Sequence, residues 1–375
     1  MRIAFYAPLK APTHPVPSGD RRMAQMLMAA LRAAGHRVDP ACALRTLDHG
    51  KVAGRQARLR DLGRRAARLL VRRWRDAPPD LWFTYHLYHK APDWTGPAVA
   101  DALGIPYVVA EASHAPKQAH GPWAEGHAAA EAAIRRADRV LAITAADTGC
   151  LARIVAPDRL VRLAPFLDPA PFSAAAAERP AHRAALAARL GLPADEPWLV
   201  AVGMMRDGDK SRSWHLLARA LERLRPIPWR LLAVGDGPRR DDIEAAFAHL
   251  DPGRVRFLGG LAPPDLAACC AACDLMVWPA VNEAYGMALL EGQAAGLPVV
   301  AGRTGGVPDV VADGVTGLLP PVGDADAFAA AMAELLRDPV RRAAMSAAAR
   351  TRIADVHGFG RAVSVLDAVV REVCG

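Results

Sequence analysis

The sequence predicts an α/β protein with two doubly wound, Rossmann-like domains, each built on a parallel sheet. Short apolar segments alternate with helical segments along most of the chain, a pattern typical of parallel strands whose connecting helices cover both faces. The alternation loosens in a proline-rich stretch between Pro165 and Pro197 and then starts again. A chain of 375 residues also suits two cores better than one. We therefore expect domains at 1–170 and 171–357 that face a central cleft, with a helix at 358–375 that packs back on the first domain.

The first domain is expected to open with a buried strand that proline residues bring to an end. Each later strand is a run of apolar residues, and each helix carries apolar residues at helical spacing. Gly19 and Gly35 mark the start and the end of the first helix. The expected strands are 3–9, around Val38, 80–86, 106–113, 140–144 and 159–166, and the expected helices are 19–34, 55–75, 94–103 and 123–137.

The second domain repeats the same alternation after the proline-rich stretch. Its expected strands are 198–204, 229–238, 255–260, 275–280 and 298–302, and its expected helices are 214–224, 240–250, 264–273 and 286–295. In sheets of this kind ligands bind at the carboxyl ends of the strands, where loops and helix N-termini gather. The cleft between the two halves is therefore the expected site.

Composition excludes several classes of protein. Apolar residues make up 52% of the chain and charged residues 23%, as in globular proteins and unlike disordered or fibrous ones. The longest apolar runs fall well short of the roughly 18 residues that a membrane span needs. The N-terminus lacks the features of an export signal, and the six cysteines lack the spacing of a disulfide framework or a metal site. We expect a cytoplasmic protein.

The positive charge is concentrated in one segment. Residues 51–75 hold ten Lys or Arg and one acid, a local charge of +9, whereas the whole chain carries +8, so the other 350 residues sum to −1. The basic helix at 55–75 also contains leucines, a composition suited to anionic lipid headgroups at the inner face of a membrane. The alternative is a solvated helix whose apolar stripe packs on its own domain. Nucleic acid is not expected, because no aromatic platform accompanies the charge.

Two acids in the second domain are spaced for sugar recognition. Glu283 precedes a helix that is expected to begin at Gly286, and Glu291 lies eight residues after Glu283, about two turns along. The backbone N–H groups of Gly286, Met287 and Ala288 at the helix start would bind a phosphate. Acids next to anion-binding amides suit a sugar attached to a diphosphate. The alternative is that Glu283 caps the helix and Glu291 is a solvated surface charge.

Two cations follow the first strand of the second domain. Gly203 lies near the end of that strand, and Arg206 and Lys210 lie in the loop expected after it, where they could neutralise a diphosphate. Acid pairs at 207–209 and 324–326 are better interpreted as a turn and a helix cap than as metal ligands. We expect no bound metal.

The first domain offers polar residues at the ends of its own strands. Ser18, Gly19 and Asp20 precede the first helix, where a glycine lets the backbone approach a ligand; an ordinary helix cap is the alternative. His114 follows another strand, and both His114 and Glu111, near the end of that strand, are expected to face the same cleft. A loop histidine is also often structural or merely exposed.

The order of motifs across 197–340 resembles the family 4 retaining glycosyltransferases of the GT-B architecture. The motifs are VGMMRDGDK, LLAVGDGP, VRFLGGL, CDLMVWPA, NEAYGMALLE, GLPVVAGRTGGVPDVV and DGVTGLLPPVGD. The first half is similar more loosely, through the glycine loop at 19, the AGHRV segment and a PF-D-PF segment. Two departures are visible: Met204 and Met205 separate the glycine from Arg206, and SGD replaces the family's paired glycines.

The resemblance implies specific roles for the site residues. Glu283 would contact hydroxyls of the donor sugar, Glu291 would hold the ribose, and Arg206, Lys210 and the amides at 286–288 would stabilise the leaving diphosphate. The strand end from Leu258 to Leu261, with Gly259, would contribute to the base pocket, and His114 would position sugar or acceptor.

These residues lead us to expect an enzyme that moves a hexosyl unit from a nucleotide diphosphate sugar to an acceptor hydroxyl with retention of anomeric configuration. The acceptor could be a lipid-linked or cell-envelope glycan, and no cofactor or metal is expected. One alternative is a phosphorylase-like or sugar-phosphate-using enzyme of the same architecture. Another is a non-catalytic adaptor that binds nucleotide or membrane.

Overall fold

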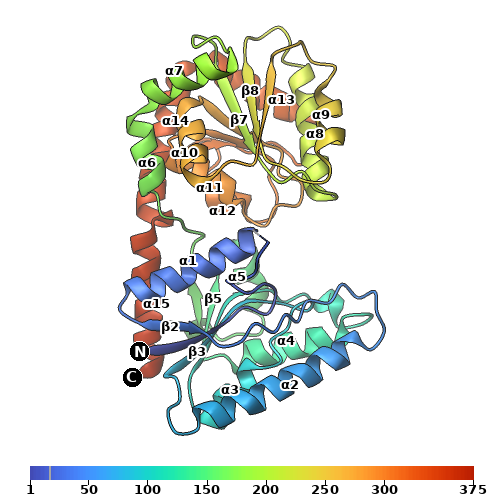
Figure 1. The fold of residues 1–375 in the computed structure, drawn as a ribbon, viewed down its shortest axis with the longest axis vertical. Helices are drawn as coiled ribbons and strands as arrows, with labels where there is room; N and C mark the ends of the chain where they lie inside the picture. The colour runs from blue at the N-terminus through green and yellow to red at the C-terminus, as the bar shows by residue number, and fades with distance from the viewer. Residues whose placement is uncertain (17) are drawn as a thin grey trace. The chain divides into compact units, whose positions relative to one another are not determined.

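The computed structural model describes residues 1–16 and 18–375, which form two compact units (Figure 1). Unit 1 comprises Met1–Ala164 together with Phe359–Gly375, and unit 2 comprises Pro165–Gly358. Each unit contains a six-stranded sheet in which all paired strands run parallel. The predicted fold class, an α/β protein with two doubly wound sheets, is confirmed.

The sheet of unit 1 has the strand order β2-β1-β3-β4-β5-β6. Apolar residues fill the strands because helices cover both faces, and Phe5, Phe83 and Val108 are fully buried. The strands are β1 (Arg2–Tyr6), β2 (Arg37–Pro40), β3 (Leu81–Leu87), β4 (Tyr107–Ala112), β5 (Arg139–Ala142) and β6 (Leu160–Arg162). The helices are α1 (Gly19–Ala33), α2 (Arg55–Trp74), α3 (Gly96–Leu103), α4 (Ala124–Arg136), α5 (Ala145–Leu151) and α15 (Phe359–Cys374).

The last helix, α15, belongs to unit 1 although the whole of unit 2 precedes it in the sequence. It packs beside α1, and its Leu366 is fully buried. Two polar contacts add to this packing: His36 Nε2 lies 3.1 Å from Asp367 Oδ1, and Arg139 forms an ion pair with Glu372. The end of the described chain therefore completes the first unit (Figure 1).

The sheet of unit 2 has the strand order β12-β11-β10-β7-β8-β9. Its strands are β7 (Trp198–Val202), β8 (Arg230–Val234), β9 (Val255–Gly259), β10 (Leu275–Trp278), β11 (Val299–Ala301) and β12 (Gly317–Leu318). Its helices are α6 (Ala170–Ala177), α7 (Arg179–Leu190), α8 (Asp209–Glu222), α9 (Arg240–Phe247), α10 (Pro263–Ala272), α11 (Met287–Ala294), α12 (Val307–Val310), α13 (Ala325–Arg337) and α14 (Pro339–Arg352).

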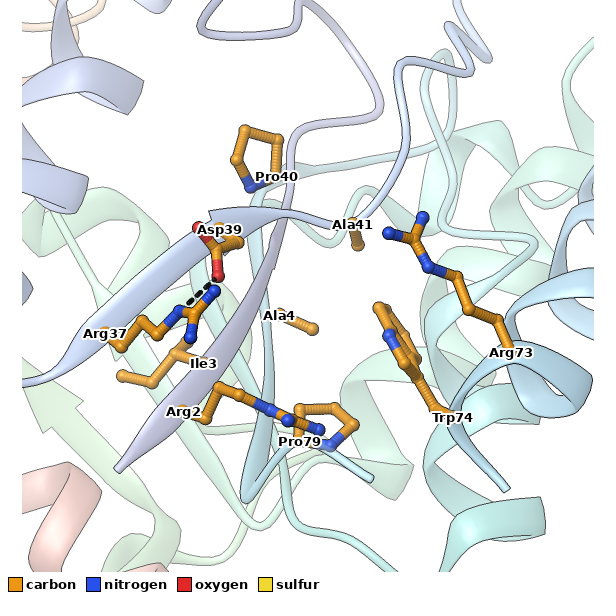
Figure 2. A pocket seen from close by; sticks show the side chains of 10 residues that line it. All are labelled: Arg2, Ile3, Ala4, Arg37, Asp39, Pro40, Ala41, Arg73, Trp74 and Pro79. Carbon is orange, nitrogen blue, oxygen red and sulfur yellow. Dashed lines mark hydrogen bonds and ion pairs between the residues drawn. The ribbon is translucent and has the colours of Figure 1, made fainter. Parts of the chain in front are cut away.

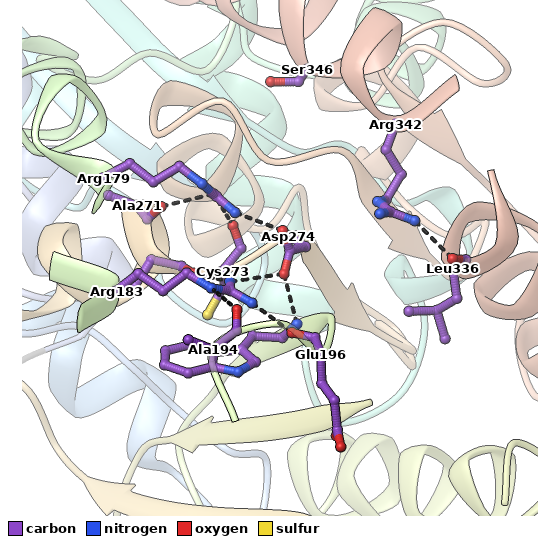
Figure 3. Close-up of polar contacts among 12 residues, drawn as sticks. Arg179, Arg183, Ala194, Glu196, Ala271, Cys273, Asp274, Leu336, Arg342 and Ser346 are labelled. Atoms are coloured by element: carbon purple, nitrogen blue, oxygen red, sulfur yellow. Dashed lines mark hydrogen bonds and ion pairs between the residues drawn. The ribbon is translucent and has the colours of Figure 1, made fainter. Parts of the chain in front are cut away.

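The proline-rich stretch that the sequence marked as a loose connection is mostly helical. Its helices α6 and α7 both pack against α10. Arg179 Nη2 lies 2.6 Å from Asp274 Oδ1, and Arg183 Nη1 lies 2.9 Å from Asp274 Oδ2, which also accepts a hydrogen bond from Trp198 N at 2.7 Å (Figure 3). One carboxylate thus ties α7 to the start of β7, and the prolines at these helix starts are compatible with helix because the first turn needs no amide donor.

Helix α8 begins five residues before the expected start at Trp214. Gly208, with φ 87°, precedes the helix, and Asp209 lies in its first turn, where a negative charge is favourable. Lys210 is therefore part of a helix and not of a loop, which corrects the expectation from sequence. No helix in the described ranges 1–16 and 18–375 is long and apolar enough to cross a membrane.

Candidate functional site

The predicted site residues of unit 2 follow two strands that are neighbours in the sheet. Strand β7 pairs with β10 on one side and with β8 on the other, so the strand order reverses direction at β7. Doubly wound sheets bind ligands outside the carboxyl ends of the strands at such a point. Gly203, Arg206 and Lys210 follow β7 and Glu283 follows β10, so the topology gathers them at one edge of unit 2.

Lys210 and Glu283 form a direct ion pair at this edge. Lys210 Nζ lies 2.5 Å from Glu283 Oε2, and the two side chains are 21% and 16% exposed. Trp278, the last residue of β10, donates a hydrogen bond from its indole Nε1 to the same carboxylate oxygen at 3.2 Å. The ammonium group also lies 5.4 Å from the centre of the Trp278 ring, a cation–π contact. Both charges are fixed in place and both remain accessible to a ligand.

The segment between β10 and α11 has a strained backbone. Ala280 and Asn282 have φ values of 54° and 52°, which non-glycine residues seldom adopt. Asn282 Nδ2 donates to Asp209 Oδ2 at 2.8 Å, and Ser213 Oγ accepts from Val281 N at 3.0 Å, so α8 holds the strained segment. Strain of this kind concentrates at functional sites.

The structure places Gly286 at the start of α11 and Glu291 inside the helix. Gly286 has φ 81° and forms the N-cap, and Met287 and Ala288 are the first two residues of the helix. The amide groups of a first helical turn are not used within the helix and suit an anion. Glu291 is only 5% exposed, so the alternative that it is a solvated surface charge is wrong.

Close backbone approaches hold the loops after β7, β8 and β9 together. Gly203 N donates to Val234 O, Met205 N to Asp236 O, and Gly235 N to Gly259 O, at 2.9–3.0 Å. A Cβ on Gly235 would lie 1.9 Å from Gly203 O, so the spacing requires glycine there. Gly259 ends β9, and Leu261 follows it on the partly exposed edge. Arg206, by contrast, has an exposed side chain.

Sequence reasoning missed Trp278 and Asn282 in this site. Trp278 looked like an ordinary buried strand residue, and only its position as the last residue of β10 signals that it reaches the site. Asn282 carried a weak signal, because asparagine is enriched at positive φ.

A second cluster of polar residues lies in unit 1. Its strand order also reverses, between β1 and β3, and Asp20 follows β1 while His86 lies near the end of β3. His86 Nδ1 lies 3.2 Å from Asp20 Oδ1 and 3.5 Å from Glu111 Oε1 on β4. His86 and Glu111 have φ values of 62° and 56°, so both are strained. His86 was missed in the sequence, although it is a polar residue at the end of an otherwise buried strand.

The charges in this cluster are strongly coupled. Burial raises the pKa of Glu111 to about 7, even though the positive charge of His86 opposes the shift. Burial alone would lower the pKa of His86, but Glu111 and Asp20 raise it overall. The pKa of Asp20 is lowered, because its contact with His86 outweighs the effect of burial. The cluster can therefore hold or release a proton near neutral pH.

Ser18 and Gly19 behave as a helix start. Ser18 Oγ accepts a hydrogen bond from Arg21 N at 3.2 Å and so caps α1, as the alternative interpretation of this motif proposed. A Cβ on Gly19 would meet no atom within 4 Å, so the structure shows open space above this residue.

His114 lies apart from the contacts among Asp20, His86 and Glu111. Its side chain is 8% exposed, and its Nε2 lies 3.2 Å from Glu131 Oε2 on α4. Its ring also lies beside that of His127, with 5.1 Å between centroids. The structure thus brings Asp20 and Glu111 together, as expected, and places His114 against α4.

A separate pocket of about 410 Å³ in unit 1 lies along β1 and the edge strand β2 (Figure 2). Arg2, Arg37, Arg73 and Trp74 are among its lining residues, and Arg37 is paired with Asp39 at 3.1 Å. None of its lining residues belongs to the contacts among Asp20, His86 and Glu111. This pocket is not part of the candidate site.

Two doubly wound units, each with polar residues at its point of strand reversal, define the GT-B fold, and solved structures share it. Sucrose-phosphate synthase from Thermosynechococcus elongatus matches 99% of this chain and 98% of its own with a TM-score of 0.75 and 22% identity. Anabaena HepE in complex with UDP matches 99% of each chain with a TM-score of 0.74 and 17% identity. The glycosyltransferase WaaG matches 99% of this chain and 100% of its own with a TM-score of 0.67 and 19% identity. At these identities the likeness concerns the fold.

The sequence of unit 2 resembles a known family. Residues 196–338 match the family described as Glycosyl transferases group 1, which confirms the resemblance seen in the sequence. D-inositol 3-phosphate glycosyltransferase of Saccharomonospora viridis is 34% identical over 231 residues, covering 59% of this chain and 52% of the relative. The same enzyme of Kineococcus radiotolerans is 35% identical over 249 residues, covering 60% and 55%. The matches thus span about half the length of these relatives.

Proposed function

We propose that the chain is a retaining glycosyltransferase that transfers a hexosyl unit from a nucleotide diphosphate sugar to an acceptor hydroxyl. The observation that carries the proposal is the Lys210–Glu283 pair beside Trp278, at the strand-reversal point of unit 2 and next to the start of α11. One fixed cation and one fixed carboxylate, side by side, match a ligand that has a diphosphate next to sugar hydroxyls. The match of residues 196–338 to the glycosyltransferase family supports the same activity.

A bound donor would separate the Lys210–Glu283 pair. The diphosphate would bind the Lys210 ammonium group and the backbone amides of Gly286, Met287 and Ala288. The sugar hydroxyls would donate hydrogen bonds to the Glu283 carboxylate. The buried Glu291 would hold the ribose, and the strand end at Gly259 and Leu261 would contact the base. HepE is described in complexes with UDP and with UDP-glucose, so UDP-hexoses are the first donors to test.

In the proposed reaction the bond between the sugar C1 and the diphosphate oxygen breaks, and a bond between C1 and the acceptor oxygen forms on the same face. The proton of the acceptor hydroxyl passes to the departing phosphate oxygen. Lys210, Arg206 and the α11 amides stabilise the negative charge on the leaving group through preorganised positive charge and N–H groups. No metal is needed for that step, so transfer is expected without added Mg²⁺.

The acceptor is expected to use the cluster of unit 1. Asp20, His86 and Glu111 offer carboxylate acceptors and an imidazole donor, which suit the hydroxyls of a polyol or sugar. The relatives are named for D-inositol 3-phosphate, and a hydroxylated ring of that kind is a fitting acceptor class. We also propose that α2 attaches the enzyme to the inner face of an anionic membrane, where a lipid-linked or envelope glycan would be the acceptor.

The test begins with thermal-shift measurements on UDP, GDP, ADP and their common sugar conjugates. A base-selective rise in melting temperature that weakens in Lys210→Ala is expected, because ligand binding to the folded state stabilises it. The stabilising sugar nucleotide is then incubated with candidate acceptors, and NMR of the product gives its anomeric configuration. A protein that binds the nucleotide and never consumes it is a binding module, and an inverted product would exclude the retaining reaction.

A further inference from the structure

Three side chains with metal-binding groups gather beside α4 in unit 1. His127 and Glu131 lie four residues apart, about one turn, on α4, and His114 comes from the segment that follows β4. One donor atom from each residue can be chosen so that all three lie within 4.8 Å of one another. Among the described residues 1–16 and 18–375, these form the one group of three such donors. A helical i, i+4 pair joined by a loop residue is a compact arrangement for holding an ion.

The spacing fits coordination by a small divalent ion. His114 Nε2 lies 3.2 Å from Glu131 Oε2. Ligand atoms placed about 2.0–2.1 Å from a tetrahedral zinc ion are about 3.4 Å apart, so this pair already has the required separation. The His114 and His127 rings lie 5.1 Å apart between centroids with 41° between their planes, so a modest ring rotation would bring in the third donor.

Both imidazoles are buried, and one nitrogen of each ring has no hydrogen-bond partner. His114 Nδ1 and His127 Nε2 are inaccessible to solvent and have no hydrogen-bond partner. The His114 side chain is 8% exposed and His127 is 7% exposed. A buried polar atom without a hydrogen-bond partner destabilises the folded state by about 1–3 kcal/mol. Such atoms are rare in folded proteins, and a bound ligand is one explanation for them. A metal ion would use the lone pair of His127 Nε2 as a ligand.

The charges around the group are compatible with a cation. Arg135 contacts Glu131 Oε1 at 2.8 Å, which leaves Oε2 directed at His114. His114 itself is held by the group and not by the Asp20–His86–Glu111 cluster.

We propose that His114, His127 and Glu131 form a binding site for one divalent transition-metal ion, with zinc as the best match. Two imidazoles and one carboxylate are an established zinc ligand set, with water in the fourth position. The ion would fasten the β4–α4 connection to α4. It takes no part in the proposed transfer step, and it gives His114 a ligand role in place of the positioning role expected from sequence.

The test is metal binding by the full-length protein, freed of any affinity tag and stripped of metal with a chelator. Isothermal titration with Zn²⁺ and the visible absorption of bound Co²⁺ should show one ion per chain. A saturating metal should also raise the melting temperature. Glu131→Gln and His127→Asn should each weaken binding more than about tenfold, since loss of a ligand costs at least as much as loss of its hydrogen-bond partner.

The control is His182→Asn on α7 in unit 2, which should bind metal as the parent protein does. Glu131 is 30% exposed on its side chain, so Glu131→Gln keeps the fold even if His127→Asn proves unstable. The proposal is wrong if the parent chain shows no stoichiometric binding, or if the Glu131 variant binds as tightly as the parent. Because the readout is metal binding, its failure would leave the proposed transferase activity untouched.

Discussion

Lys210 Nζ lies 2.5 Å from Glu283 Oε2, and in the proposed reaction the donor replaces this contact with its own. Replacing Lys210 with Ala removes the fixed positive charge and leaves the carboxylate without its partner. We expect kcat for donor turnover to fall about 100- to 1,000-fold, as when one preorganised group at a developing charge is lost. Steady-state kinetics with the donor identified by thermal shift would measure this.

Lys51→Ala, an exposed lysine before α2, is the matched control and should leave turnover of a soluble acceptor unchanged. Arg206→Ala should cost less than Lys210→Ala, because the Arg206 side chain is exposed and can move into solvent. An undiminished rate in Lys210→Ala would contradict the proposed site.

Glu111 is expected to make stability depend on pH. Its pKa is raised from 4.5 to about 7 in the folded protein, so its contribution to stability is present below about pH 4.5 and is lost as the pH rises through 7. Glu111→Gln should therefore be more stable than the parent at pH 8, by on the order of 3 kcal/mol, and should lose this advantage at pH 4.5.

Urea unfolding of the two proteins at pH 4.5, 6 and 8 would test the effect of Glu111. Glu178→Gln, which changes an exposed carboxylate of unit 2, is the control. An advantage of Glu111→Gln that stays constant across this pH range would show that Glu111 has an ordinary pKa.

The positions of single residues were predictable where they follow from strand order. Lys210, Glu283 and Gly286 stand directly after expected strands, and parallel topology brings such positions to one edge. Trp278 and His86 were missed because both belong to segments that looked like buried strands. Whether such a residue reaches the site depends on the face of the sheet to which its side chain points. Successive strand residues point to opposite faces, so an error of one residue in the strand end reverses the expected direction.

Helix α2 presents two different faces. Gln56, Leu59, Gly63, Ala67 and Leu70 are buried on one face, whereas Leu62 and Leu69 are 42% and 64% exposed on another. The exposed leucines continue a helical row with the exposed Arg58, Arg65 and Arg72. The apolar stripe that packs on the domain and the proposed membrane face are therefore both present, on different sides of the helix.

We expect Leu62→Ser combined with Leu69→Ser to weaken binding to anionic vesicles by about tenfold, because two exposed apolar anchors are lost. Co-sedimentation with phosphatidylglycerol-containing vesicles would measure it, with pure phosphatidylcholine as the neutral comparison. Val340→Ser, at an exposed apolar residue of α14, is the control. Equal binding by the parent chain to both vesicle types would contradict the membrane proposal.

The loop after β8 should be intolerant of any side chain at Gly235. Gly235→Ala places a methyl group 1.9 Å from Gly203 O at a φ of 147°, so the loops after β7 and β8 must separate. We expect a loss of about 2 kcal/mol or more in stability, together with weaker nucleotide binding. Gly260→Ala is the control, since a Cβ there meets no atom within 4 Å; thermal unfolding of both variants decides the point.

Helix and strand positions were predictable to within a few residues where the apolar pattern was strong. The expected helix at 123–137 is observed at Ala124–Arg136, and the expected strand at 255–260 at Val255–Gly259. The start of α8 was misplaced because the DGDKSRS segment is polar. Its helical state depends on the capping charge of Asp209 and on contacts to Asn282, which hydrophobic periodicity does not report.

At the scale of the whole molecule, the two units differ in how the chain builds them. Unit 2 is formed by one continuous segment, whereas unit 1 needs α15 from beyond it. Leu366→Ala on α15 creates a cavity beside α1 and should cost about 2–5 kcal/mol within unit 1 alone. Hydrogen exchange should then quicken in 1–164 and stay slow in 165–358.

Val340→Ala, at a residue that is 79% exposed, is the control for this substitution and should alter exchange in neither unit. If Leu366→Ala loosened both units equally, they would unfold as a single cooperative body.

The position of α15 also sets an order of events during synthesis. Domains commonly fold as they emerge from the ribosome, beginning with the N-terminal one. Here residues 165–358 are all made before residues 359–374. Unit 2 can therefore fold completely before α15 is available to pack beside α1. The nascent first unit exposes apolar surface throughout that interval, and it is the part of the chain where a chaperone would be needed longest.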